Sequence, residues 1–430
     1  MVNDGTHTAG RTSHTISRKP SSKILANRGR PEAEILLSCA HTRVTAQKAD
    51  QIRTLCQGEL DVKYLIRIAQ QHMVVPLLFR SLSISCPESI PTEDLQTLRK
   101  YSDAIRNRNC VLTEELLHLL SVFDEHRISA IPFKGPTLAA IAYGDISLRQ
   151  FGDLDFLIHE RDLLTVESLL LSRGYRLYAG DVGVSQPTWE RTYVRIENEI
   201  SVDLHWDVMP WFFPFPCGFE QLWKRRKTMS LAGQTVYGLS DEDLLLILCV
   251  HGSKHYWSCL EWICDVAELT CANQEMNWGW LVDQAVILRS RRTLFLGLRL
   301  ARDLLDATLP KEVLGYIDDD VALAALTTQV RRRIFRDLES PLGFFERPHT
   351  VEDLDIDTVC FTLRVRESLS DKVQYCRWLL QLVMTPVAED RAFLSLPDSL
   401  SFLYYFLRPL RLIWRLGRRL IGKNMSRISV

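Results

Sequence analysis

The amino-acid sequence predicts an α+β fold, in which a small mixed sheet lies between N-terminal and C-terminal helical regions. Two observations predict it. Apolar residues recur with helical spacing over about 32–127 and again over 239–337. Between these regions, residues 128–238 contain short apolar or alternating segments separated by glycine, proline and asparagine, which are typical of strands and turns.

Length and composition limit the classes of protein to consider. A chain of 430 residues is long for one core and suits two or three domains. The formal net charge of −1 gives no broad electrostatic surface for nucleic acid. The eleven cysteines form no CxxC pair, and Cys259 and Cys264 have no matching second pair for zinc, so we expect reduced thiols and a cytoplasmic protein.

The N-terminal part divides into a tail and a helical region. Residues 1–31 are basic and rich in serine and threonine, without the apolar segment of a secretory signal, and are expected to be a disordered tail. Residues 32–127 are predicted to be helical. They end in a long amphipathic helix over 95–126 that contains neither glycine nor proline.

Residues 128–238 are predicted to form the mixed α/β core. "ISAIPF" (128–133) and "DLDFLI" (153–158) are predicted strands, and a helix between them starts near Pro136 and ends before Gly144. A second helix ends at Gly174. Two paired strands around a turn at 197–199 and a hairpin over 227–240 complete the unit.

The C-terminal part is again helical. Ser240, with Asp243 three residues later, is predicted to cap the first helix of a domain over 239–337. Residues 338–357 are predicted to be a linker or long loop, and 358–430 to be helices with a basic amphipathic end. Two alternatives remain for segment 401–422, peripheral contact with anionic lipid or packing against its own domain, and the second is favoured. Four arginines lie along one side of its helical projection: Arg408, Arg411, Arg415 and Arg418.

Acidic residues recur at the spacing of one strand face. Asp153 and Asp155 point the same way, because strand positions two apart share a face, and Asp203 and His205 share a face on a later strand. If the two strands are neighbours, Asp203 completes a cluster of three carboxylates. Such a cluster at low dielectric needs a cation, and hard oxygen ligands suit Mg²⁺ or Mn²⁺. The alternative is an isolated DxD without a metal, with Asp203 at the start of a turn.

The turn Lys134-Gly135-Pro136 precedes the first core helix. A helix N-terminus beside a tight glycine turn is an anion site, and Lys134 adds a full positive charge. Lys134 as a solvated side chain is the alternative. Thr137 and Arg149 join Lys134 and Gly135 as predicted nucleotide-binding residues, although Arg149 could equally lie at the surface.

The order of these segments resembles the nucleotidyltransferase fold of the DNA-polymerase-β superfamily. Within it, "KGPTLAAIAYGDISLRQFGDLDFLI", "VDLHWDV" and "HGSKHYWSCLEWICDVAEL" resemble a bacterial family of nucleotidyltransferases without an assigned substrate, over roughly 35–290. The resemblance implies that Asp153 and Asp155 are paired metal ligands, that Asp203 is the third carboxylate, and that Gly135 is the phosphate-turn glycine. Pro136 departs from the usual Gly-Ser or Gly-Gly turn and removes one backbone N–H donor.

The implied activity is metal-dependent transfer of a nucleoside monophosphate from a nucleoside triphosphate, such as ATP, to a hydroxyl-type acceptor. The acceptor is expected on a small molecule or protein, because the net charge argues against a long nucleic acid. The alternative function is a non-catalytic nucleotide-binding or scaffold protein that retains the fold. Pro136 favours this alternative, whereas retention of all three carboxylates argues against it.

A second polar group falls on one helical face. His251, Lys254 and His255 are spaced i, i+3 and i+4, and could line a substrate cleft together with His205 and Asp265. The alternative is a polar seam between helices, in which Asp265 pairs with Lys254 or a histidine. The HxxxH spacing lacks the glutamate of the HExxH zinc motif, so a zinc site here is not favoured.

Overall fold

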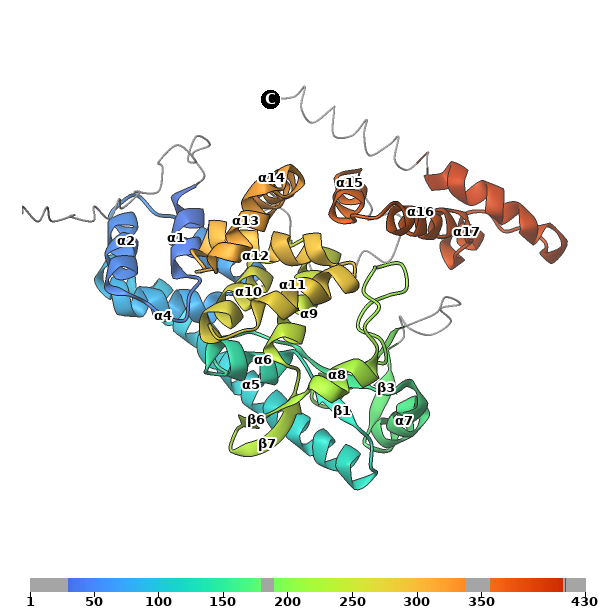
Figure 1. Ribbon diagram of the computed structural model, residues 1–430, viewed down its shortest axis with the longest axis horizontal. Coiled ribbons are helices and arrows are strands. Elements are labelled where there is room, and N and C mark those ends of the chain that lie inside the picture. The colour runs from blue at the N-terminus through green and yellow to red at the C-terminus, as the bar shows by residue number, and fades with distance from the viewer. Residues whose placement is uncertain (1–29, 179–188, 337–355, 413, 415–430) are drawn as a thin grey trace, which may run out of the picture.

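A computed structural model describes residues 30–178, 189–336, 356–412 and 414. The fold is α+β, as predicted: a mixed five-stranded sheet lies among helices from both ends of the chain (Figure 1). The predicted tail and most of the predicted linker lie outside the described residues. Helix α1 already begins at Pro31 and helix α15 at Ile356, just inside those two predicted segments.

The N-terminal helices precede the sheet and end in a long helix. Their bounds are α1 Pro31–Cys39, α2 Ala46–Cys56, α3 Val62–Gln71, α4 Val75–Ser85 and α5 Thr92–Glu125. Helix α5 confirms the long helix expected from the absence of internal glycine and proline. Its early residue Leu98 packs with the N-terminal helices, whereas Leu116 and Phe123 pack under the sheet, so α5 links two hydrophobic clusters.

The sheet has the order β1-β2-β5-β4-β3. The strand bounds are β1 Ala130–Pro132, β2 Asp153–Ile158, β3 Tyr175–Leu177, β4 Glu190–Arg195 and β5 Ile200–His205. Strands β2 and β5 are parallel, and the other three pairs are antiparallel. In the parallel pair, Asp155 is the partner of Asp203. The two strands are therefore neighbours, as the carboxylate hypothesis required.

The two faces of the sheet have different surroundings. Leu154, Phe156 and Ile158 of β2 belong to a hydrophobic cluster with α5 and helix α7 (Leu163–Ser172). The alternate residues Asp153 and Asp155 point to the opposite face, because strand side chains alternate. The alternation of residue types thus determines which face of β2 packs against which helices. The apolar residues are buried against α5 and α7, and the aspartates face the helices that follow the sheet.

A helical unit follows the sheet and covers its acidic face. After α8 (Phe219–Arg225) and the hairpin of β6 (Lys227–Leu231) and β7 (Gln234–Gly238), the helices are α9 Asp241–Lys254, α10 Leu260–Ala272, α11 Trp278–Ile287, α12 Arg291–Leu305, α13 Lys311–Asp319 and α14 Val321–Arg336. Ser240 caps α9, because its Oγ accepts a hydrogen bond from the backbone N–H of Asp243 at 3.2 Å. The predicted cap is confirmed.

The C-terminal helices α15 (Ile356–Val365), α16 (Leu369–Met384) and α17 (Ala388–Phe393) form an arm whose first helix packs on α9 and α14, while α16 and α17 extend away from them in Figure 1. Arg408 and Arg411 are buried and both pair with Asp390, at 2.9 Å and 2.6 Å. These two guanidinium groups are directed into the protein, as expected from packing against the domain rather than on lipid. Arg415 and Arg418 lie outside the described residues. No helix in the described part of the chain is long and apolar enough to cross a bilayer.

Candidate active site

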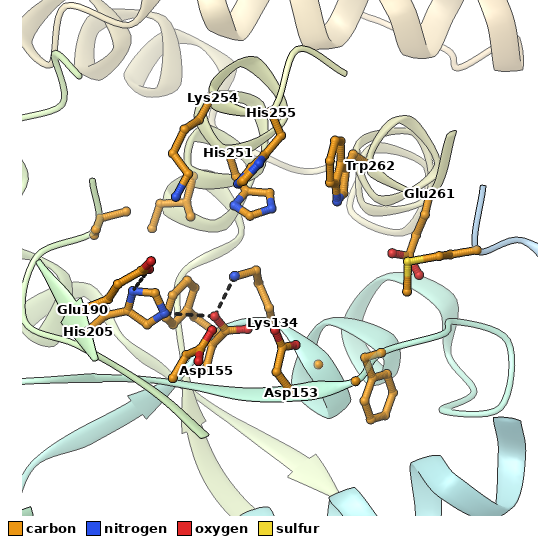
Figure 2. Close-up of a pocket in the computed structure, with 18 of the residues that line it drawn as sticks. Lys134, Asp153, Asp155, Glu190, His205, His251, Lys254, His255, Glu261 and Trp262 are labelled. Carbon is orange, nitrogen blue, oxygen red and sulfur yellow. Dashed lines mark hydrogen bonds and ion pairs between the residues drawn. The ribbon is translucent and has the colours of Figure 1, made fainter. Parts of the chain in front are cut away.

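A cavity of about 500 Å³ lies between the acidic face of the sheet and helices α9 and α10 (Figure 2). Its floor carries Asp153, Asp155 and Asp203 with Lys134 and His205. Its roof carries His251 and Lys254 of α9 and the next residue, His255. The volume lies in the range typical of small-molecule sites. Most of the predicted site residues therefore line one pocket, although they come from segments far apart in the sequence.

The carboxylates of Asp155 and Asp203 meet on the floor because of strand register. Both residues are buried, and their oxygens lie with a ring nitrogen of His205 within 4.8 Å of one another. Within the described part of the chain, this trio is the only group of at least three such side chains with metal-binding geometry. Asp153 points to the same face and lines the pocket, but it does not belong to the trio.

Asp155 has two close partners on one oxygen. Its Oδ1 is 2.6 Å from Nζ of Lys134 and 2.9 Å from Nε2 of His205. Burial alone would raise the pKa of Asp155, but the ammonium group of Lys134 and the hydrogen bond with His205 outweigh it and hold this pKa well below its usual range. Asp155 is therefore an ionised, buried carboxylate near neutral pH.

Lys134 is held beside the acids by its backbone. It precedes Gly135, which opens helix α6 (Gly135–Leu138) with a φ of +49°. A Cβ on Gly135 would lie 3.3 Å from the carbonyl oxygen of Asp153, so the turn approaches β2 as closely as glycine permits. Burial opposes the charge of Lys134, yet Asp155, Asp153 and Asp203 together raise its pKa, which keeps it a cation. The alternative of Lys134 as a solvated side chain does not hold, because this side chain is only 15% exposed.

Thr137 has a supporting position instead of a place on the pocket wall. It is buried, and its Oγ1 donates a hydrogen bond to the carbonyl oxygen of Lys134 at 2.8 Å. The predicted direct role in nucleotide binding does not fit this orientation, because the hydroxyl is used to hold the turn. Helix α6 continues into a π-helical turn, Ala139–Tyr143, which ends at Gly144 with a φ of +70°.

Asp203 is a weaker acid than an ordinary aspartate. Burial raises its pKa, and the negative charges of Asp153 and Asp155 raise it further, to about 7. The pKa of Asp155 is therefore lowered and that of its neighbour Asp203 is raised, although both side chains have the same ordinary pKa. This separation is typical of sites where one group stays ionised and the other exchanges a proton near neutral pH.

The donor set fits a divalent cation. Two carboxylates and one imidazole are ligands for Mn²⁺, and carboxylates with water or phosphate oxygens suit Mg²⁺. Oδ2 of Asp155 is buried and accepts no hydrogen bond from the described residues, so an oxygen ligand remains available. The ring Nδ1 of His205 lies 3.3 Å from a carboxylate oxygen of Glu190 without hydrogen-bond geometry, so Glu190 adds a further acidic group beside the imidazole.

The roof is aromatic and basic. The rings of His251 and His255 have centroids 4.6 Å apart, and Trp262 of α10 packs at 5.7 Å and 5.2 Å from them. Burial and the nearby cations lower the pKa of His251 well below its ordinary value, so this ring is neutral. Lys254 Nζ lies 5.6 Å from the Trp189 ring centroid and its side chain points toward the cavity in Figure 2. His251, Lys254 and His255 line the cavity, and their contact with a substrate stays a prediction.

Arg149 and Asp265 form a buried ion pair at the edge of the site. Arg149 Nε and Nη2 bind the two carboxylate oxygens of Asp265 at 2.7 Å and 2.9 Å, and the hydroxyl of Tyr143 donates to the same carboxylate at 2.8 Å. The surface alternative for Arg149 is wrong, because its side chain is only 6% exposed. The alternative in which Asp265 pairs with Lys254 or a histidine does not hold, since α10 turns its carboxylate toward Arg149 and Tyr143.

Comparison with known proteins places this site in a family. Residues 58–306, more than half of the chain, match the family described as uncharacterised nucleotidyltransferase. The chain belongs to this family. No curated protein matches it.

The match to the nucleotidyltransferase family covers the whole pocket. It begins before α3 and ends at Asp306, just beyond α12, so all the lining residues from Met73 to Trp262 lie inside it. The C-terminal helices α15–α17 lie outside it. The family therefore accounts for the sheet and both pocket walls, and the C-terminal arm is an addition to that unit.

Two acidic residues of this nucleotidyltransferase site were missed by sequence reasoning. Glu190 is the first residue of β4 and pairs in register with His205, but the alternating segment that predicts this strand, "TYVRIEN", begins only at Thr192. Glu261 is 3% exposed, lines the pocket from α10, and has a pKa raised well above its usual value by burial. Its i, i+4 spacing to Asp265 was the available signal, because the two share one face of α10.

Proposed function

We propose that this nucleotidyltransferase moves a nucleoside monophosphate from a nucleoside triphosphate to a hydroxyl-type acceptor, with Mg²⁺ or Mn²⁺ as cofactor. The observation that carries the proposal is the β2–β5 register, which brings Asp155 and Asp203 together beside His205 in a cavity large enough for a nucleotide. Three carboxylates, Asp153 included, on one face of a buried sheet support a two-metal arrangement, as in other phosphoryl-group transfer sites.

In this proposal one group of residues binds the metal ions, a second contacts the phosphates and a third stacks on the nucleobase. Asp155, Asp203 and His205, joined by Asp153, would hold the divalent ions, which supply charge neutralisation for the phosphates and acidify the acceptor hydroxyl. Lys134 and Lys254 face the cavity from opposite walls and would contact phosphate oxygens. His255 and Trp262 offer ring faces on which a nucleobase could stack.

Asp203 is the group best suited to accept the acceptor's proton. The acceptor oxygen forms a bond to the α-phosphorus, the bond from that phosphorus to the β-phosphate oxygen breaks, and pyrophosphate leaves. The hydroxyl proton passes to the carboxylate of Asp203. The place of Asp203 on the pocket floor, in register with Asp155, supports this role.

The acceptor is proposed to be a small molecule or a protein. The formal net charge of −1 gives little long-range attraction for a nucleic-acid backbone. A cytoplasmic location is also proposed, on the ground that all eleven cysteines are free thiols.

A non-catalytic nucleotide-binding role is the second candidate, and one observation favours it. Lys134 lies on Oδ1 of Asp155, where a catalytic metal would bind, and Pro136 removes a donor from the phosphate turn. A protein that uses this ammonium as a permanent substitute for the metal would bind nucleotides without transferring them.

Product formation separates the two candidates. The full chain is incubated with Mg²⁺ or Mn²⁺ and each of the four α-labelled nucleoside triphosphates, and pyrophosphate release and labelled products are measured in the presence of candidate acceptors. We expect Asp203→Asn and Asp155→Asn to lower the rate at least about a hundredfold. Asp124→Asn, in the exposed last turn of α5, is the control and should keep the wild-type rate. Nucleotide binding without any labelled product or pyrophosphate would support the second candidate instead.

A further inference from the structure

We propose that Lys134 is a displaceable counter-ion that makes the metal and the nucleotide bind cooperatively. The inference rests on the proposed function of this site and adds a role for one residue of this chain. In the structure its ammonium group neutralises Asp155, and in the loaded site the same group would neutralise a phosphate instead.

The position of the ammonium group is the first observation. Nζ of Lys134 is 2.6 Å from Oδ1 of Asp155, in the trio that has metal-binding geometry. The two side chains are 15% and 1% exposed, so this is a buried ion pair and not a solvated contact. A divalent ion bound to Asp155 on either oxygen competes with the ammonium group for the carboxylate, because two cations held this close together repel each other at low dielectric.

The backbone fixes this arrangement. A Cβ added to Gly135 would lie 3.3 Å from the carbonyl oxygen of Asp153, so the turn lies close against β2. The hydroxyl of Thr137 also donates a hydrogen bond to the carbonyl oxygen of Lys134. The long side chain can still rotate, because the turn fixes only its base. Lys134 also lines the cavity, so its ammonium group can move from the carboxylate toward a ligand without leaving the pocket.

The energetic consequence is coupling between two ligands. A metal ion that binds alone leaves a displaced ammonium group in a largely buried place without its carboxylate partner, which is unfavourable. A triphosphate supplies a new anionic partner for that group. Lys134 therefore weakens binding of the free metal and strengthens binding of the metal–nucleotide pair, with a coupling of roughly 5- to 150-fold expected for such linkage.

Lys254 provides a matched control within the same pocket. It is also a lysine that faces the cavity, but it comes from α9 on the opposite wall. Removal of Lys254 should weaken nucleotide binding without the gain in Mn²⁺ affinity expected for Lys134→Met, because the ammonium group on Oδ1 of Asp155 belongs to Lys134.

The test measures two affinities on the full chain and on Lys134→Met and Lys254→Met. The affinity for Mn²⁺ alone is measured from the electron paramagnetic resonance signal of free Mn²⁺. The affinity for fluorescent α,β-methylene nucleoside triphosphates at saturating Mn²⁺ is measured by anisotropy. For Lys134→Met we expect Mn²⁺ to bind at least about tenfold more tightly and the nucleotide at least about tenfold more weakly than in the wild type.

Tighter Mn²⁺ binding together with weaker nucleotide binding in Lys134→Met would show that Lys134 pairs with Asp155 in the empty site and with a phosphate in the loaded site. If Mn²⁺ binds the wild type and Lys134→Met leaves either affinity unchanged, or weakens both, the inference is wrong and the proposed function stands. If no Mn²⁺ binds the wild type or either variant, the proposed metal site itself is wrong. The double variant Lys134→Met with Asp155→Asn should lose the tight Mn²⁺ binding expected for Lys134→Met alone, which would show that the ion binds at Asp155.

A second variant guards against loss of folding. Lys134→Gln retains a hydrogen-bond donor for Asp155 while it removes the charge. Its melting temperature should fall below that of the wild type in EDTA and rise more than the wild type on addition of Mn²⁺. Equal Mn²⁺-induced shifts in the two proteins would contradict the inference.

Discussion

At the scale of single residues, Asp203 links the stability of the protein to pH. Burial and two neighbouring carboxylates raise its folded-state pKa to about 7, whereas an ordinary aspartate has a pKa near 3.8. Between about pH 4 and 7 the folded chain therefore binds more protons at this position than the unfolded chain does. The stability contributed by this group is fully present below about pH 4 and is lost as the pH rises through about 7.

Asp203→Asn should remove this pH dependence. In metal-free buffer, the free energy of unfolding of the wild type is expected to fall relative to that of the variant by about 2–4 kcal/mol between pH 4 and 8. Urea denaturation of both proteins across this range measures the difference. Parallel curves for the two proteins would show that Asp203 has an ordinary acidity.

Gly135 is the residue whose replacement should test the close approach of the turn to β2. Gly135→Ala meets both a positive φ of +49° and a backbone oxygen at 3.3 Å, whereas Gly144→Ala meets a positive φ of +70° and nothing within 4 Å. We expect Gly144→Ala to cost about 1 kcal/mol and Gly135→Ala to cost clearly more. Thermal and urea unfolding give the comparison, and equal costs would mean that the turn can shift freely away from Asp153.

At the scale of secondary structure elements, a buried ion pair fastens the segment before β2 to helix α10. Arg149 and Asp265 are 6% and 1% exposed at the side chain, and Tyr143 from the π-helical turn shares the carboxylate. Burial costs both charges hydration, but the bidentate geometry and the extra hydrogen bond compensate for it. The pocket floor and the pocket roof are therefore held at a fixed separation.

Asp265→Asn should be strongly destabilising, by about 3 kcal/mol, because it leaves the guanidinium group of Arg149 buried with a weaker partner. The double variant Arg149→Met with Asp265→Leu should recover much of this loss, since both charges are then removed. Urea denaturation of the single and double variants measures the effect. A loss below about 1 kcal/mol for Asp265→Asn would mean that Glu261, 3.8 Å from Arg149, compensates for most of the charge.

The strands and helices of the core were predictable from the sequence, but the ion-pair partners of its buried charged side chains were not. The alternation in "DLDFLI" places Asp153 and Asp155 on one face, and glycines mark the helix ends, because these are local properties of the chain. The pairing of Lys134 with Asp155 and of Arg149 with Asp265 depends on which faces meet in three dimensions. Local spacing cannot give this, so the sequence assigned Lys134 and Arg149 to phosphate without their carboxylate partners Asp155 and Asp265. Thr137 was expected there for the same reason.

At the scale of the whole molecule, the C-terminal helices hold a segment of the pocket wall. Residues 206–218 follow β5, and Val208 and Met209 in this segment line the cavity. The ring of Phe212 stacks on Trp378 of α16 with centroids 4.1 Å apart, and Arg366 donates a hydrogen bond to the carbonyl oxygen of Phe212 at 2.9 Å. The arm outside the family match therefore touches the wall of the site inside it.

Trp378→Ala should loosen this wall without a change in the carboxylate trio. Loss of the stacked pair is expected to speed amide hydrogen exchange in residues 206–213 by roughly tenfold. Phe406→Ala is the control, because Phe406 is 66% exposed and should leave exchange in this segment unchanged. Unaltered exchange after Trp378→Ala would show that the segment is held by the sheet alone.

The parallel register of β2 and β5 has a consequence for how the protein matures. Asp155 and Asp203 become partners only after the intervening helix and strands have folded back across the sheet, since a parallel pair needs a long crossover. Contacts between such distant segments form late, because closing the intervening loop costs chain entropy first. A newly made chain would thus form the proposed cation site in one of the last steps of folding, and uptake of a luminescent lanthanide would then mark completed chains.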